Sequence, residues 1–154
     1  MRAFIWIAGL LLVSACATTP NTPEEPLVAT TPTETVGLSA RKLAPGTCGL
    51  FIWSASQPPH FLAYIEQGQS HADVFYNGAE TSFILLPPNA VLTLTARIHL
   101  RLKQVNTNDI LDITLAEQQD IPKGSRYAKG TLISNAKEGW RRTIPIIGIA
   151  GCAG

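Results

Sequence analysis

Few residues in this 154-residue chain have the chemistry of catalytic or metal sites, and they are spread along it. His71 and Asp73 are separated by one residue, so on a β-strand their side chains point to the same face. Such a pair could bind a metal ion or act as a general base. The other histidines, His60 and His99, stand apart from this pair, and no serine or cysteine nucleophile occurs in a recognisable setting.

The sequence also lacks the common motifs of catalysis. It contains no Gly-rich phosphate loop, no zinc signature and no Gly-x-Ser-x-Gly elbow. We therefore expect His71 and Asp73 to be surface polar residues, and we expect a non-catalytic protein without a cofactor or a bound metal. An enzyme whose site is assembled only in three dimensions remains the alternative.

Cys16, the first of three cysteines, follows a short apolar leader. The leader, residues 1–15, reads MRAFIWIAGLLLVSA, with a positive start at Arg2, an apolar centre and a small-residue cleavage site at Ser14-Ala15. The stretch Val13-Ser14-Ala15-Cys16 resembles the lipobox of bacterial lipoproteins. This resemblance implies a signal peptide over residues 1–15, cleavage before Cys16, a diacylglyceryl thioether on its sulfur and acylation of the new amine.

The lipobox resemblance also predicts a location in the cell envelope. Residue 17 is Ala, not the Asp that marks retention in the inner membrane in such lipoproteins, so we expect an outer-membrane lipoprotein facing the periplasm or the cell surface. Several acyl chains anchor a protein stably, whereas one binds only marginally. A secreted protein without lipid and a membrane-anchored protein are the alternatives. The second is disfavoured because a spanning helix needs about 20 apolar residues.

Residues 16–45 have the composition of a lipid-anchored linker. Residues 17–45 contain five prolines and seven threonines, and no aromatic residue. Such a segment buries too little apolar surface to offset the entropy lost on folding. We therefore place the folded domain at residues 46–154. There, nine basic and eight acidic residues leave a charge of +1, which provides no global field to attract nucleic acid.

Cys48 and Cys152 lie at the two ends of this domain. In an oxidising compartment they are expected to form a disulfide, because no close Cys-x-x-Cys spacing suggests a metal site. Such a bond closes a loop of about 100 residues and requires the first and last strands to lie side by side, with Cα atoms within about 7 Å.

The apolar pattern of the domain is that of β-strands. The clearest case is Val91 to Gln104, where six apolar residues alternate with polar ones. Asn77-Gly78 is the sharpest turn signal, because both residues tolerate the positive φ of a type I′ hairpin. The pattern predicts an all-β domain, a single small antiparallel barrel of about eight strands in a meander, closed by the disulfide. A β-sandwich is the alternative. The expected strands are 49–54, 61–66, 72–76, 81–86, 91–104, 110–117, 126–134 and 140–150.

Two groups of residues suggest a binding surface. The first, the basic stripe, consists of Arg97, His99, Arg101 and Lys103, which alternate on the polar face of the expected strand 91–104. Such a stripe could bind an acidic envelope polymer or an acidic patch on an envelope protein, unless Asp112 and Glu117 neutralise it from the next strand.

The second group combines residue types that often anchor interfaces. It consists of Gly124-Ser125-Arg126-Tyr127 and Gly139-Trp140-Arg141-Arg142, with Trp140 and Arg141 as the candidate binding residues. A Trp that caps the barrel core beside solvated arginines is the alternative interpretation.

The expected architecture is similar to that of the membrane-bound inhibitors of c-type lysozyme, which are small disulfide-linked β-barrels. Ser125-Arg126-Tyr127 before Lys129-Gly130 faintly resembles their sequence, but their Ser-Gly loop with its aromatic pair is missing. We expect a lipid-anchored envelope protein with a non-catalytic binding or scaffolding role. A periplasmic inhibitor of a cell-wall hydrolase is the alternative that this resemblance implies.

The lipobox leads to a direct test. We expect Cys16→Ala to leave uncleaved precursor and to abolish labelling with an alkyne-tagged fatty acid, because the thioether can form only on that sulfur. Labelling that persists in the variant would refute the lipidation of Cys16.

Overall fold

The computed structural model describes residues 36–135 and 141–154. The leader, Cys16 and Trp140 therefore lie outside the described residues. Among the described residues there is no helix, and so none that could cross a membrane. They form eight strands: β1 (Cys48–Ser54), β2 (Phe61–Glu66), β3 (His71–Tyr76), β4 (Ala79–Leu85), β5 (Ile98–Gln104), β6 (Ile110–Ile121), β7 (Gly124–Asn135) and β8 (Arg141–Cys152).

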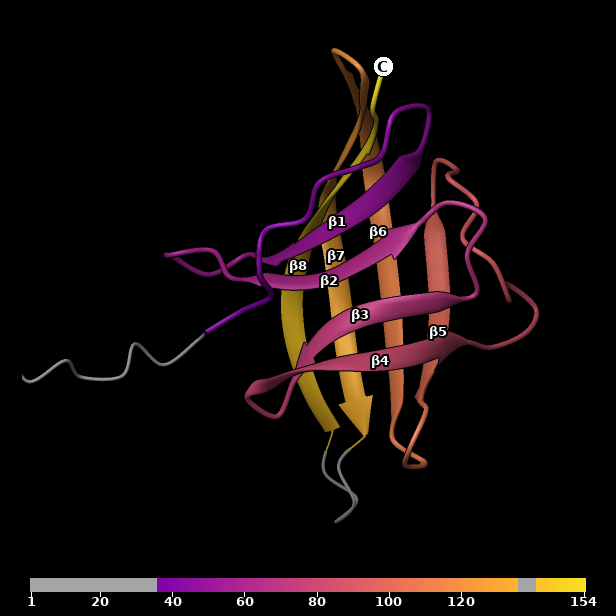
Figure 1. Ribbon diagram of the computed structural model, residues 1–154. Coiled ribbons are helices and arrows are strands. Elements are labelled where there is room, and N and C mark those ends of the chain that lie inside the picture. Colours follow the sequence, from indigo (N-terminus) through magenta and orange to yellow (C-terminus); the bar gives the residue numbers. More distant parts are fainter. Residues whose placement is uncertain (1–35, 136–140) are drawn as a thin grey trace, which may run out of the picture. The chain divides into compact units, whose positions relative to one another are not determined.

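The eight strands form a closed antiparallel barrel in which each strand pairs with its neighbours in sequence (Figure 1). β1 completes the ring by pairing with β8. The predicted meander barrel is therefore confirmed. The sandwich alternative is excluded, because all eight strands belong to one closed sheet.

The disulfide lies where this ring closes. Cys48 and Cys152 are directly opposite each other in the β1–β8 ladder and are bonded, with Cα atoms 3.9 Å apart. The predicted bond between the first and last strands is confirmed. It joins residues 104 positions apart, so it removes much of the conformational freedom of the unfolded chain.

The barrel interior is filled by the apolar side chains that alternate along each strand. On β6, for example, Leu111, Ile113 and Leu115 are fully buried, while the residues between them are only partly buried. Interior positions of a small barrel are filled in this way, because its lumen is only as wide as its side chains. Other core residues are Leu50, Ile52, Ile65, Val74, Phe83, Leu100, Leu102 and Ile146.

The predicted strand 91–104 is wrong in its first half, because β5 begins only at Ile98. The preceding strand ends at Leu85, just before Pro87 and Pro88, which have no N–H group to donate to a ladder. Residues 91–97 instead cover one end of the barrel. Leu92 is 1% exposed there, and its backbone bonds to Gln69 and Gly68 in the β2–β3 turn.

Tyr127 of β7 closes the same end from inside. Its side chain is fully buried, and its hydroxyl donates a 2.7 Å hydrogen bond to the Thr95 carbonyl oxygen. Gly148 of β8 lies against this ring, since a Cβ there would be 3.4 Å from Tyr127 and 2.8 Å from Leu115. The side chains of Leu92 and Tyr127 therefore fill the interior at this end of the barrel.

The sequence predicts the β3–β4 hairpin better than the β6–β7 hairpin. Asn77 and Gly78 have φ angles of 51° and 82°, which confirms the positive-φ turn between β3 and β4. β6 and β7 run longer than predicted, with Ile121 paired to Gly124 at the tip of their hairpin.

Residues 36–45, which their composition assigns to the linker, lie against the barrel. Leu38 is 8% exposed and its N–H donates to the Phe61 carbonyl oxygen at 2.8 Å. Arg41 forms ion pairs with Asp73 of β3 and Glu80 of β4. The buried side chain of Leu38 and the ion pairs of Arg41 thus hold this segment against the barrel, although its composition predicts no packing.

The Tyr127 hydrogen bond can be tested with a conservative substitution. We expect Tyr127→Phe to lower the free energy of unfolding at neutral pH by about 1–2 kcal/mol, because the buried tyrosine loses its hydrogen bond to the Thr95 carbonyl. Tyr64→Phe is the control, since the Tyr64 hydroxyl lies 3.4 Å from the Glu66 carboxylate near the surface. Urea unfolding of the three proteins measures the difference, and equal losses in both variants would contradict the assignment.

The same variant should respond differently to alkaline pH. Burial raises the pKa of Tyr127 above its ordinary value of 10.0. The unfolded chain loses this proton first, so the stabilisation is complete below pH 10 and is lost as the pH rises through the folded-state pKa. We expect the stability advantage of the wild type over Tyr127→Phe to shrink as the pH rises from 10.0, the ordinary tyrosine pKa, to the higher folded-state pKa. An advantage that stays constant to pH 11 would contradict this.

Candidate functional site

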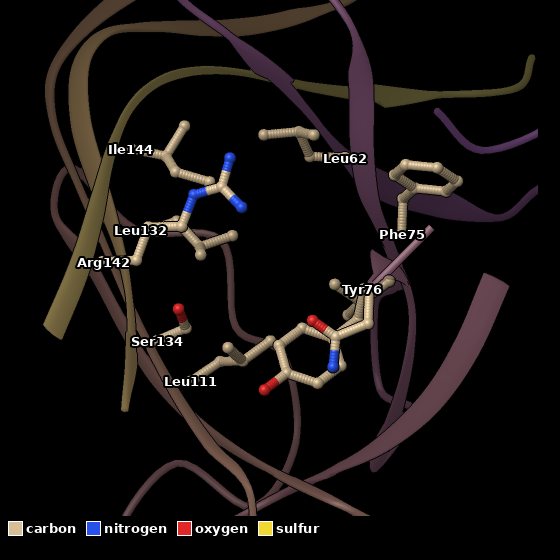
Figure 2. A pocket seen from close by; sticks show the side chains of 10 residues that line it. Leu62, Phe75, Tyr76, Leu111, Leu132, Ser134, Arg142 and Ile144 are labelled. Carbon is tan, nitrogen blue, oxygen red and sulfur yellow. The ribbon is translucent and has the colours of Figure 1, made fainter. Parts of the chain in front are cut away.

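The opposite end of the barrel is not filled. A recess of about 250 Å³ opens there, among the ends of β2, β3, β6, β7 and β8 (Figure 2). Most of its wall is apolar, and Arg142, Asn77, Ser134 and Tyr76 supply the polar groups. The apolar lining consists of Leu62, Val74, Phe75, Leu111, Leu132 and Ile144.

Leu62 reaches this recess because β2 contains a bulge. Ile52 pairs with Ala63, but Trp53 pairs with Phe61, so Leu62 is the extra residue between them. A bulge redirects a side chain relative to the regular alternation. Phe61 therefore stacks on Trp53 outside the barrel, with ring centroids 5.2 Å apart, while Leu62 packs against the core at the mouth.

Arg142 reaches the recess by regular alternation along β8. Ile146 and Ala150 are buried in the interior, and Ile144, two residues before Ile146, is partly buried against the core. Arg142 precedes Ile144 by two residues and pairs with Ser134, whose side chain is itself buried. Figure 2 shows the Arg142 guanidinium projecting into the recess from β8, across from Leu62.

A second recess of about 420 Å³ continues from the first toward the β1–β2 loop. Both are lined by Leu62, Phe75, Asn77, Arg142 and Ile144, so together they form one mouth site. Its volume lies in the range of about 300–1,000 Å³ that is typical of ligand pockets.

Ser54, Ser56 and His60 line the second recess, and their hydrogen bonds limit the chemistry of the mouth site. The Ser54 hydroxyl lies 2.7 Å from that of Ser56 and accepts a 2.8 Å hydrogen bond from the backbone N–H of His60. The backbone of His60, rather than its imidazole, therefore contacts this serine. The arrangement orders the β1–β2 loop and is not the side-chain pair that activates a serine nucleophile.

The electrostatics of the mouth site are dominated by Arg142. Among the described residues, the ion pairs involve Arg41, Arg101 and Lys129, and no acidic partner is found for Arg142. On the far wall, burial and then the nearby charge of Asp109 raise the pKa of Tyr76, so its hydroxyl stays protonated at neutral pH. The mouth site thus has a positively charged group on β8 and a neutral tyrosine hydroxyl on the wall across from it.

Another hollow, of about 460 Å³, lies on the outer face over β1 and β2. It is lined by Leu38, Ala40, Arg41, Phe51, Trp53 and Phe61. Its one cation, Arg41, pairs through one terminal guanidinium nitrogen with Asp73 and Glu80, while its buried Nε has no hydrogen-bond partner among the described residues.

The basic stripe is only partly a feature of β5. His99, Arg101 and Lys103 lie on the outer face of the strand, whereas Arg97 belongs to the loop before it. Arg101 lies 3.6 Å from Asp112 and its side chain remains 56% exposed. A shallow recess of about 240 Å³ lies beside Arg97 and His99. The stripe as a binding surface stays a prediction.

Glu117 was the other acid expected to neutralise the basic stripe. It lies at a positive-φ position of β6 and forms a 2.6 Å ion pair with Lys129 of β7 instead. Of the two acids, Asp112 interacts with the basic stripe through Arg101, whereas Glu117 pairs with Lys129.

The second sequence group is divided by the structure. Tyr127 is fully buried, so it belongs to the core and not to an interface. Arg141 is exposed at the start of β8, opposite Asn135, and Trp140 lies outside the described residues. Arg142 belongs to this group, but sequence reasoning singled out Trp140 and Arg141 and not Arg142 as binding residues. The alternation Arg142, Ile144, Ile146 could have indicated it, because it places this arginine in the interior phase of the strand.

His71 and Asp73 do not form a site together. His71 is exposed, and the Asp73 carboxylate accepts a 3.2 Å hydrogen bond from Arg41. Within residues 36–135 and 141–154, no cluster of three metal-ligating side chains occurs.

No family model, curated protein or solved structure matches the chain. The function must therefore be argued from the geometry and chemistry of the site alone.

The basic stripe can be tested with a matched control. We expect the triple variant Arg97→Gln, Arg101→Gln, Lys103→Gln to fold normally, because exposed charges contribute little to stability. Its binding to lipopolysaccharide aggregates should be weaker than that of the wild type at low salt and equal at high salt.

The control removes the same charge elsewhere. The residues Lys123, Arg126 and Lys129 lie on the β6–β7 hairpin and are all exposed. Their triple Gln variant should bind like the wild type. If both triple variants lose the same affinity, only net charge matters and the stripe is not a binding surface.

Proposed function

We propose that this chain is a lipid-anchored protein of the cell envelope that binds a ligand in the mouth site without catalysing a reaction. The single observation that carries the proposal is the contrast between the two ends of the barrel. One end is packed by Leu92 and Tyr127, while the other leaves a recess lined by apolar side chains and a few polar groups.

The form of the mouth site supports binding. Ligand sites in proteins are concave and mostly apolar, with a small number of placed polar groups that fix orientation. The mouth site has this composition, and its residues come from six different strands. Such residues are held by the ladders of the barrel, so the recess is preformed and little ordering entropy opposes binding.

The chemistry of the mouth site supports a role without catalysis. The serines Ser54 and Ser56 bond to each other, and the imidazole of His60 is not what holds them. General acid–base catalysis needs titratable groups within hydrogen-bond reach of the reacting atoms. Arg142, the cation that lines both recesses, does not exchange its proton near neutral pH, and the described hydrogen bonds of His60 in the second recess involve its backbone.

The leader supports the envelope location. The Val13–Cys16 stretch predicts a lipid on Cys16, and the ligand would then be met at a membrane surface. The basic stripe, on the outer face of β5, would remain free to contact an acidic envelope polymer or protein at the same time.

The mouth site can be tested with a neutral apolar dye. We expect Nile red to bind the purified full chain and to lose most of that fluorescence in Leu62→Trp and in Ser134→Phe, because both fill the recess from opposite walls. Using two variants guards against a local folding defect in one, and thermal unfolding of each checks the fold. If neither folded variant reduces the dye signal, ligand binding in the mouth site is refuted.

A further inference from the structure

We propose that the ligand of the mouth site is a single-chain amphiphile with a carboxylate head, which Arg142 binds while the apolar chain enters the recess. This inference rests on the proposed function and names the ligand class for the same site.

The position of Arg142 is the first argument. It shares the interior phase of β8 with Ile144 and Ile146, and its exposed side chain places the guanidinium over the recess (Figure 2). It lines both recesses of the mouth site. Among the described residues, no acidic side chain pairs with it.

The kind of head group follows from the donors at hand. A guanidinium is planar and presents two parallel N–H groups, which match the two oxygens of a carboxylate. Apart from Arg142 and Tyr76, two polar side chains line the first recess. Asn77 supplies an amide and Ser134 supplies a hydroxyl. One bidentate cation with two neutral groups suits a single carboxylate better than a phosphate, whose three oxygens require more donors.

The charge on the opposite wall places the head at β8. Asp109 lies near the Tyr76 hydroxyl, where its charge helps to raise the Tyr76 pKa. A carboxylate would be repelled there and attracted to Arg142. The apolar chain then extends along Leu62 and Ile144 toward Leu111 and Leu132.

A peptide fits the mouth site less well than an aliphatic chain. Bound peptides usually take backbone hydrogen bonds from a free strand edge. The barrel is closed, so a peptide would find at the mouth only the short stretch of β3, Phe75 and Tyr76, that lies beyond its two-pair ladder with β2. An aliphatic chain requires only apolar contact, which is what most of the lining residues supply.

The experiment varies the head group at constant chain length. The mature chain, residues 16–154 with Cys16→Ala, is titrated calorimetrically with decanoate, decanol and decyltrimethylammonium, each below its micelle concentration, so that neither a protein-bound acyl chain nor the apolar leader competes. We expect decanoate to bind about fivefold more tightly than decanol, the scale of an exposed charge-assisted contact, and the cation to bind most weakly. High salt should remove most of the difference.

Substitution at adjacent positions locates the head group. We expect Arg142→Gln to bind decanoate no better than decanol, and Arg142→Lys to retain part of the preference, because it keeps the charge but loses the planar fork. Arg141→Gln is the matched control: it removes the same charge one residue away on the outer side of β8 and should leave the preference intact.

The outcomes separate this inference from the proposed function. Equal binding of decanoate and decanol by the wild type would overturn the carboxylate head while Nile red still reports the recess. Binding of acetyl-Leu-Leu, which has a free carboxylate, more tightly than decanoate would overturn the single-chain class in favour of a peptide terminus. A preference lost equally in Arg141→Gln and Arg142→Gln would overturn the assignment to Arg142.

Discussion

The pairing of β1 with β8 is the constraint on which the rest of the structure depends. Seven residue pairs join the two strands, from Cys48 opposite Cys152 to Ser54 opposite Ile146. Without this ladder both strands would be open edges, which expose unpaired backbone groups and invite aggregation. The ladder also determines which side chains of the last strand face inward. The disulfide at its end holds the closure against the entropy of a loop of about 100 residues.

The two ends of the closed barrel differ in how completely side chains fill them. At one end Leu92, carried by an irregular segment, lies beneath the β2–β3 turn, and Tyr127 bonds to Thr95 inside. At the other end the wall is made by short aliphatic side chains and by Arg142, which is too polar to fold back into the core. A barrel of this size has room for little more than its own side chains, so a recess persists only where the residues fail to reach across.

The positive charges of the domain occur in two different environments. On β5, Arg101 lies on the open outer face and already interacts with Asp112. Charges of this kind act mainly on encounter and orientation, and salt screens them. Arg142 instead lies at the rim of an apolar recess, where part of the surrounding water is replaced by side chains and a bound anion would be screened less. The same residue type thus suits a diffuse acidic surface in one place and a defined ligand in the other.

The sequence by itself determined the strand alternation, the Asn77-Gly78 turn, the closure through Cys48 and Cys152, and hence the barrel, because these depend on local periodicity and on one covalent bond. Only the tertiary structure decided where the site lies. The alternation over residues 91–97 is indistinguishable from that of a strand until β4 ends before Pro87 and leaves the segment without a partner. Likewise, Arg141 and Arg142 are adjacent arginines that the sequence does not distinguish. The register of β8, which places Arg142 opposite Ser134, makes Arg142 the cation of the mouth site and leaves Arg141 on the outer face. Register depends on contacts between distant strands, which composition and spacing do not contain.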